Sequence, residues 1–203
     1  MNYLAIDTSG KNLTVIIKNG DNIYSYYDLE CGVNHSVNLM PEIEKLIKKA
    51  DFSLENADFF VCVVGAGSFT GIRIGVSTVK ALCFAFNKPC LSITSFDTLA
   101  YNENNGKVLA LIDAKHNGFY ACGYNDKKID FEPKYILREE AEKLSKNYDI
   151  IVSNQEILGF NIKVVSLLDG LKNAIREKQE EISYDIDALS PLYCRKSQAE
   201  EGR

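Results

Sequence analysis

Tryptophan is absent from this sequence, and histidine occurs only twice, as His35 and His116. The six cysteines include no Cys-x-x-Cys pair, so the spacing typical of zinc sites is missing. Several of them lie inside apolar runs, which favours reduced side chains packed in a core. We therefore expect no bound metal and no other cofactor.

Basic residues are outnumbered by acidic ones, with 23 Lys and Arg against 28 Asp and Glu and a net charge of −5. No basic stripe is visible, which argues against tight nucleic-acid binding by this chain alone. The longest apolar stretches are broken by polar residues well short of a membrane span. The first residues, MNYLAID, carry no basic region and no cleavage-site pattern. We expect a cytoplasmic globular protein.

Two halves of the chain show the same predicted order of three strands, a helix and a strand. In the first half, an Asn-Gly dipeptide predicts a hairpin, and Pro41 indicates a helix that starts near Met40 or is kinked there. The first half comprises strands 3–6, 13–18, 23–27 and 59–64 and a helix through 39–47. The second comprises strands 107–112, 119–124, 129–135 and 149–152 and a helix at 138–146.

The stretch LAIDTSG (4–10) matches ALIDAKH (110–116), because each is an apolar strand that ends in Asp before a turn. We interpret the match as an internal duplication that forms two mixed sheets with a cleft between them. The expected lobes are 1–100 and 101–190, followed by an extension or tail at 191–203.

Carboxylates end the first strand of each half, at Asp7 and Asp113. If both point into a shared cleft, they could hold a metal-bound phosphate, as in sugar kinases and actin-like ATPases. Thr8 and Ser9 would supply hydroxyl and backbone donors to it. The alternative is that this segment is turn chemistry and nothing more.

A glycine-rich loop, GAGSFTG, joins the strand ending at Val64 to a helix predicted from Gly71 to Asn87. It lacks the lysine of a P-loop. Gly65, Gly67 and Ser68 could still bind an anion through the free backbone amides of a helix N-terminus. The alternative is a tight turn with glycines at positive φ.

The helix after this loop is apolar on two sides. Ile72, Val76 and Val79 belong to the face that should pack on the sheet. Nearly opposite lie Ile74, Ala81 and Ala85, with Phe84 nearby, where a surface helix is normally polar. This second side predicts a protein interface, although a second domain or a loop could also cover it.

Five motifs together resemble the bacterial TsaB (YeaZ) family: DTSG, HS, GAGSFTGIRIG, DAKHNGFY and PLYCRKSQAE. The resemblance implies the actin/hexokinase/Hsp70-like (ASKHA) fold, a duplicated α/β ribonuclease H-like fold whose two lobes have mixed β-sheets flanked by helices. It also implies a non-catalytic relative of TsaD, the subunit that transfers threonylcarbamoyl to the adenosine beside the tRNA anticodon. The implied partners are a TsaD-like catalytic subunit and a TsaE-like ATPase, with a homodimer when alone and tRNA contacted only through the complex.

In this family the interface uses the two helices of the first half, and no catalytic residue is expected. The His-x-x-x-His metal motif of TsaD is absent, since Leu39 and Tyr120 stand four residues beyond the histidines. A small ATP-dependent kinase or ATPase and a metallopeptidase remain the alternative functions. The expected interface residues are His35, Leu39, Ile43, Arg73, Ile74, Ser77, Ala81, Phe84 and Ala85.

Overall fold

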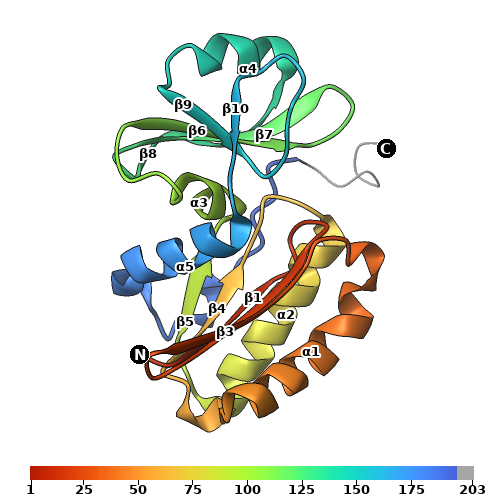
Figure 1. Ribbon diagram of the computed structural model, residues 1–203, viewed down its shortest axis with the longest axis vertical. Coiled ribbons are helices and arrows are strands. Elements are labelled where there is room, and N and C mark those ends of the chain that lie inside the picture. Colours follow the sequence, from red (N-terminus) through yellow and green to blue (C-terminus); the bar gives the residue numbers. More distant parts are fainter. Residues whose placement is uncertain (196–203) are drawn as a thin grey trace. The chain divides into compact units, whose positions relative to one another are not determined.

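The computed structural model describes residues 1–195 (Figure 1). The chain divides into a first unit, Met1–Ile93 with Ile175–Leu192, and a second unit, Thr94–Ala174 with 193–195 among the described residues. These bounds differ from the expected lobes because residues 175–192 return to the first unit. The polar tail predicted at 197–203 lies outside the described residues.

A five-stranded mixed sheet forms the first unit, in the order β3-β2-β1-β4-β5. β1, β2 and β3 are antiparallel neighbours, and the Asn-Gly turn closes the β2–β3 hairpin with Asn19 opposite Asn22. β4 runs parallel to β1, and β5 runs parallel to β4. The sequence pattern missed β5, which has only four residues. The strands are β1 (Tyr3–Asp7), β2 (Leu13–Asn19), β3 (Asn22–Asp28), β4 (Phe59–Val63) and β5 (Cys90–Ile93).

The second unit repeats this sheet, in the order β10-β9-β6-β7-β8. β6, β7 and β8 are antiparallel neighbours, and β9 and β10 continue the sheet in parallel from the other edge of β6. If β6 is counted as the first strand of its unit, β7 as the second and so on, the second sheet has the same strand order as the first. This agreement confirms the duplicated α/β fold. The strands are β6 (Lys107–Asp113), β7 (Gly118–Asn125), β8 (Lys128–Leu137), β9 (Ile150–Ser153) and β10 (Ile162–Val164).

The helix predicted either to start near Met40 or to be kinked there begins at His35 and continues through Pro41, so the later start was wrong. The earlier start is tolerated because Pro41 and Val37 both lie on the exposed side of the helix. The Val37 carbonyl, which receives no amide hydrogen bond from a proline, can therefore face water. The helices are α1 (His35–Ala50), α2 (Phe69–Phe86), α3 (Ser95–Ala100), α4 (Arg138–Ser145) and α5 (Leu167–Glu177), with short 3-10 helices at 32–34, 54–56, 179–181 and 186–188.

α1 and α2 lie side by side on one face of the first sheet, α1 over β2 and β3 and α2 over β4 and β1 (Figure 1). Their inward side chains and those of the strands form the core of this unit. Removing this apolar surface from water is the main favourable contribution to the fold. The buried helix residues are His35, Leu39, Ile43, Leu46 and Ala50 in α1 and Gly71, Ile72, Gly75, Val76, Val79 and Cys83 in α2.

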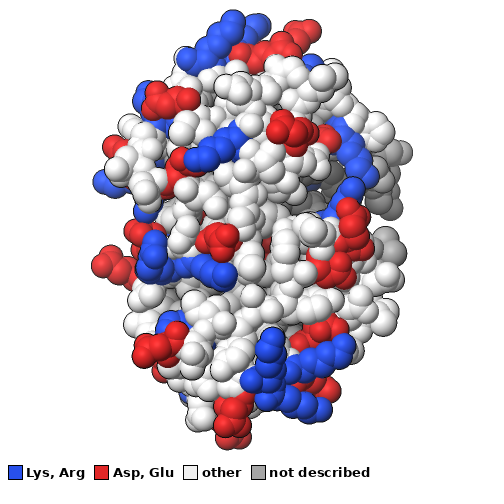
Figure 2. Space-filling view, viewed as in Figure 1, with Lys and Arg blue, Asp and Glu red and all other residues white. Residues whose placement is uncertain are grey.

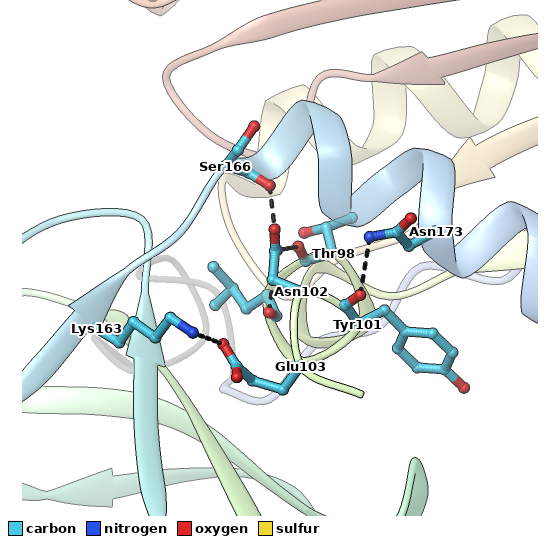
Figure 3. Close-up of polar contacts among 8 residues, drawn as sticks. Thr98, Tyr101, Asn102, Glu103, Lys163, Ser166 and Asn173 are labelled. Atoms are coloured by element: carbon cyan, nitrogen blue, oxygen red, sulfur yellow. Dashed lines mark hydrogen bonds and ion pairs between the residues drawn. The ribbon is translucent and has the colours of Figure 1, made fainter. Parts of the chain in front are cut away.

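In the second unit, α3 is held against the start of α5 by backbone carbonyls and amide side chains (Figure 3). Asn102 donates through Nδ2 to the carbonyls of Thr98 at 3.0 Å and Ser166 at 3.1 Å. Asn173 donates to the Tyr101 carbonyl at 3.1 Å. A Cβ atom at Gly170 would overlap the Thr98 carbonyl, so a glycine is required at this close approach.

Within residues 1–195, α2 is the one helix long and apolar enough to cross a membrane by length and composition. Ile72, Val76 and Val79 of this helix are buried against the sheet.

Candidate functional site

The two loops that the sequence singled out, DTSG and GAGSFTG, pack directly against each other in the first unit. The Ser68 amide donates to the Ser9 carbonyl at 2.6 Å. The Thr8 hydroxyl donates to the Gly71 carbonyl at 2.7 Å. The end of β1 and the start of α2 are thus joined by hydrogen bonds in both directions.

Glycines permit this contact. A Cβ atom at Gly67 would overlap the Ser9 carbonyl, and one at Gly71 would overlap the Thr8 carbonyl. At Gly75 a Cβ atom would lie 2.6 Å from the Thr8 hydroxyl oxygen. The glycines of GSFTGIRIG therefore let helix and strand approach closely.

Of the three residues predicted to offer free amides to an anion, Gly65, Gly67 and Ser68, the last has its amide bonded to the chain itself, and the anion site stays a prediction. Besides the Ser68 amide, Gly71 donates to the Ser68 hydroxyl at 3.2 Å and Ile72 donates to the Ser68 carbonyl at 2.9 Å. Ser68 is the N-cap of the helix. The backbone of residues 8 and 9 lies next to this end of the helix.

Asp7 and Asp113 play the same local part in the two units. Asp7 Oδ1 accepts from the Ser9 amide at 2.8 Å, and Asp113 Oδ1 accepts from the Lys115 amide, also at 2.8 Å. Each carboxylate thus stabilises the turn that follows its strand. Asp7 and Asp113 belong to different units, and their predicted meeting in one cleft stays a prediction.

The environments of the two carboxylates differ. Asp7 is 5 % exposed, whereas Asp113 is exposed. Burial raises the pKa of Asp7, against the opposing effects of hydrogen bonds from the Ser9 hydroxyl and amide and of the nearby His35. Among the described residues, no group of three or more His, Cys, Asp or Glu side chains could hold a metal ion.

Three residues predicted to lie in an interface are instead buried in the chain's own core. Leu39 and Ile43 point from α1 onto the sheet. His35 is 3 % exposed and contacts the Gly10 carbonyl through Nε2 at 3.0 Å. These residues recur every four positions along the inward side of the helix, so the prediction chose the wrong face of α1.

The other predicted residues lie on the outward side of α2. Phe84 is 84 % exposed, Ala81 and Ala85 are exposed, and Ile74 is half-buried. Arg73 and Ser77 are also exposed, and the Arg73 guanidinium lies 3.9 Å from the centre of the Phe69 ring. An apolar patch at such a place is typical of an interaction surface.

Two exposed apolar residues on the neighbouring helix were not predicted to lie in an interface, Val37 at 68 % and Met40 at 48 % exposure. They lie three residues apart, on the side of α1 away from Leu39 and Ile43, and this helical spacing is the signal that could have found them. The α1–α2 face is defined here as Val37, Met40, Ile74, Ser77, Ala81, Phe84 and Ala85.

The hydroxyl groups near this face already have partners within the helix. Ser77 donates to the Arg73 carbonyl at 2.7 Å, and Thr78 donates to the Ile74 carbonyl at 2.8 Å. A partner could therefore cover these hydroxyls without leaving an unsatisfied donor, which would otherwise cost free energy.

Charges of both signs are mixed on the face of the surface that Figure 2 shows. Figure 2 shows Lys and Arg interspersed with Asp and Glu on the viewed side of each unit. On α1, the exposed positions outside the α1–α2 face include Glu44, Lys45 and Lys48. An apolar patch with charged neighbours resembles the core and rim of a protein interface.

Known proteins resemble this chain in sequence and in fold. The family model of TsaD, tRNA N6-adenosine threonylcarbamoyltransferase, matches residues 30–156, more than half of the chain. The tRNA threonylcarbamoyladenosine biosynthesis protein TsaB of Bacillus subtilis (strain 168) is 33% identical over 129 residues, which are 63% of this chain and 56% of that protein. TsaB of Escherichia coli (strain K12) is 29% identical over 128 residues, 61% of this chain and 55% of that protein.

The matched part of the chain thus spans little more than half the length of these curated relatives. A crystal structure from Pseudomonas aeruginosa, of an uncharacterized protein with similarity to peptidase YEAZ, superimposes with a TM-score of 0.78 at 21% identity. That superposition covers 96% of this chain and 99% of that chain, and it shows a common fold. From the motifs, the repeated sheet and these matches together, the chain belongs to the TsaB (YeaZ) family, within the group of proteins that the TsaD family model describes.

Proposed function

We propose that this chain is a cytoplasmic, non-catalytic subunit of the machinery that forms threonylcarbamoyladenosine beside the anticodon of tRNA. In this role it docks on a TsaD-like catalytic subunit and works with a TsaE-like ATPase. It touches tRNA only through the complex. The relatives carry the name of this pathway, which supports the proposal.

One observation carries the docking role: the outward side of α2 is apolar and exposed, with Phe84 in its last turn 84 % exposed. A helix that only covers its own sheet needs one apolar side. The second apolar side stabilises a complex when another protein lies against it, because burying a large apolar side chain contributes about 1.5 to 3 kcal/mol to the free energy of association. The same face would join two copies of the chain when the catalytic subunit is absent.

The proposed lack of catalysis is supported by the state of the two loops that hold phosphate in related folds. Ser9 and Ser68 bond to each other through their backbone atoms. The buried Asp7 accepts from the Ser9 amide and hydroxyl at 2.8 and 2.7 Å. These groups serve the loop contact and the turn.

The test is the modified nucleoside itself. Depletion of this chain in its own cells is expected to lower threonylcarbamoyladenosine in digested tRNA, measured by liquid chromatography and mass spectrometry. Wild-type chain should restore it. The purified chain alone should transfer no threonylcarbamoyl group to tRNA, and it should co-elute with the TsaD-like subunit. Transfer by the isolated chain, or unchanged tRNA after depletion, would contradict the proposal.

A further inference from the structure

The strand β3 lies at one edge of the first sheet, where β2 is its neighbour on one side. On its other side no strand pairs with it within residues 1–195. The backbone N–H and C=O groups along such an edge can pair with a strand of another molecule. Native proteins usually prevent this by covering the edge or by placing proline and charged residues on it.

The other three sheet edges carry such protection. On β5, Ser183 exchanges two backbone hydrogen bonds with Cys90, at 2.8 and 2.9 Å. β8 contains Pro133 and several charged side chains, and its pairing with β7 is interrupted by register shifts around Gly123. β10 has only three residues. In contrast, β3 is seven residues long, contains no proline and carries a single charged side chain, that of Asp28.

The turn before β3 determines which of its backbone groups point outward. Gly20 has φ of 60°, and Asn19 lies opposite Asn22, so two residues form the turn. In a hairpin with a two-residue turn, the pair that flanks the turn exchanges backbone hydrogen bonds, and this pattern alternates along the strands. Every second residue from Asn22 onward is therefore bonded to β2. The backbone groups that point away from β2 are those of Ile23, Ser25 and Tyr27.

These outward groups are complementary to those of a second copy of β3. When two copies run antiparallel with Ser25 opposite Ser25, Ile23 of each copy lies opposite Tyr27 of the other. All three outward residues then exchange backbone hydrogen bonds with the second copy. A register shifted by two residues either way leaves one outward residue of each copy without a partner in the strand.

The side chains of β3 suit the same register. Two tyrosines of each copy would meet on the side of the strand that packs against the core beneath α1. Aromatic pairs, pairs of aromatic with β-branched residues and pairs of complementary polar groups stabilise neighbouring strands, and like charges facing each other destabilise them. No like charges meet in this register. The facing residues are Tyr24 with Tyr26, Ile23 with Tyr27 and Asn22 with Asp28.

We propose that two copies of this chain pair antiparallel through β3, centred on Ser25, and so join their two five-stranded sheets into one. A single strand pair is a small interface, so the association is weak and increases with protein concentration. The contact does not use the outward side of α2, which lies over β4 and β1. It therefore goes beyond the proposed docking role and would join two docked complexes through this chain.

Cross-linking at the centre of the strand pair tests this contact. Facing residues of a hydrogen-bonded antiparallel pair have Cα atoms about 5.5 Å apart, within the range that a disulfide spans. Ser25→Cys, made in a chain that also carries Cys194→Ser, has its new thiol at an exposed position, and the other cysteines are buried. After oxidation with diamide at increasing protein concentration, we expect a covalent dimer on non-reducing gels. Dithiothreitol should convert it to monomer.

Asn22→Cys in the same background is the matched control. In the proposed register its two thiols lie as far apart as residues 22 and 28 of one strand, about 20 Å, so we expect about tenfold less dimer. Ile23→Pro, added to Ser25→Cys, removes an outward N–H but no hydrogen bond to β2. It should leave the circular dichroism spectrum unchanged and lower the yield of dimer about fivefold.

A further variant separates this inference from the proposed function. Ala81→Arg, which disturbs the α1–α2 face, should leave the yield of dimer from Ser25→Cys unchanged. The inference is wrong if Ser25→Cys gives no more dimer than Asn22→Cys, or if Ile23→Pro leaves a folded chain with the same yield. It is also wrong if Ala81→Arg abolishes the cross-link, because the dimer would then arise from the α1–α2 face.

Discussion

The ring of His35 donates through Nε2 to the Gly10 carbonyl at a distance of 3.0 Å. A carbonyl can only accept, so this nitrogen carries the proton. Nδ1 of the same ring is buried without a hydrogen-bond partner. The contact joins the first residue of α1 to the loop after β1, so His35 stabilises the fold from inside the first unit.

Replacing His35 by alanine should destabilise the chain. The substitution leaves the Gly10 carbonyl without its donor and opens a cavity, which should lower the free energy of unfolding by about 1 to 3 kcal/mol in urea titrations. Val37→Ala on the exposed side of the same helix should change it by less than about 0.5 kcal/mol. If His35→Ala is as stable as the wild type but binds its partner more weakly, His35 is an interface residue and the assignment to the core is wrong.

Gly71→Ala should be strongly destabilising because the added methyl group overlaps the Thr8 carbonyl. Alanine otherwise favours a helix over glycine by about 1 kcal/mol, so the sign of the effect depends on this overlap. We expect a loss of about 2 kcal/mol or more in the free energy of unfolding.

The matched control for this substitution is Gly10→Ala, in the loop that Gly71 contacts. Its new Cβ atom would have its nearest neighbour, the Asn12 amide nitrogen, at 3.9 Å. Equal effects of the two substitutions on urea unfolding would show that close packing is not what the glycine at position 71 provides.

Ala81→Arg tests the α1–α2 face. Ala81 is exposed, so the folded chain can accommodate the arginine, whereas a partner lying against this helix would have to bury an unpaired charge. We expect unchanged thermal unfolding but loss of self-association by size-exclusion chromatography and of binding to the TsaD-like subunit in pull-downs. The control is Asn22→Arg, which adds the same charge at an exposed position of β3. Retained binding by Ala81→Arg would mean that the docking surface lies elsewhere.

Asp7 should make stability depend on pH. Burial raises its pKa in the folded chain, so its contribution is most favourable below the unfolded pKa and is lost as the pH rises toward the folded value. Asp7→Asn keeps an acceptor for the Ser9 amide and removes this titration.

Wild type should therefore become less stable relative to Asp7→Asn as the pH rises from about 4 toward 8, measured by urea unfolding at each pH. Asp21→Asn, in the exposed β2–β3 turn, controls for the loss of one negative charge. The raised pKa of Asp7 would be contradicted if the difference in stability between wild type and Asp7→Asn stays constant with pH or grows in favour of wild type.

Local patterns in the sequence were sufficient for much of the fold. The β2–β3 hairpin followed from Asn19-Gly20, and the duplication from the two strands ending in Asp7 and Asp113. The exposed apolar side of α2 also followed from spacing alone, since Ala81 and Ala85 lie opposite Val79 and Cys83 at 3.6 residues per turn. Each of these features depends on residues close together in the chain.

Only the tertiary structure decided which side of α1 faces water, because both of its sides carry apolar residues and periodicity does not choose between them. It also decided what the glycine-rich loop GAGSFTG contacts, since the Ser9–Ser68 hydrogen bond joins segments far apart in the chain. Contacts of this kind arise from packing, and packing leaves no periodic signal in the amino-acid order.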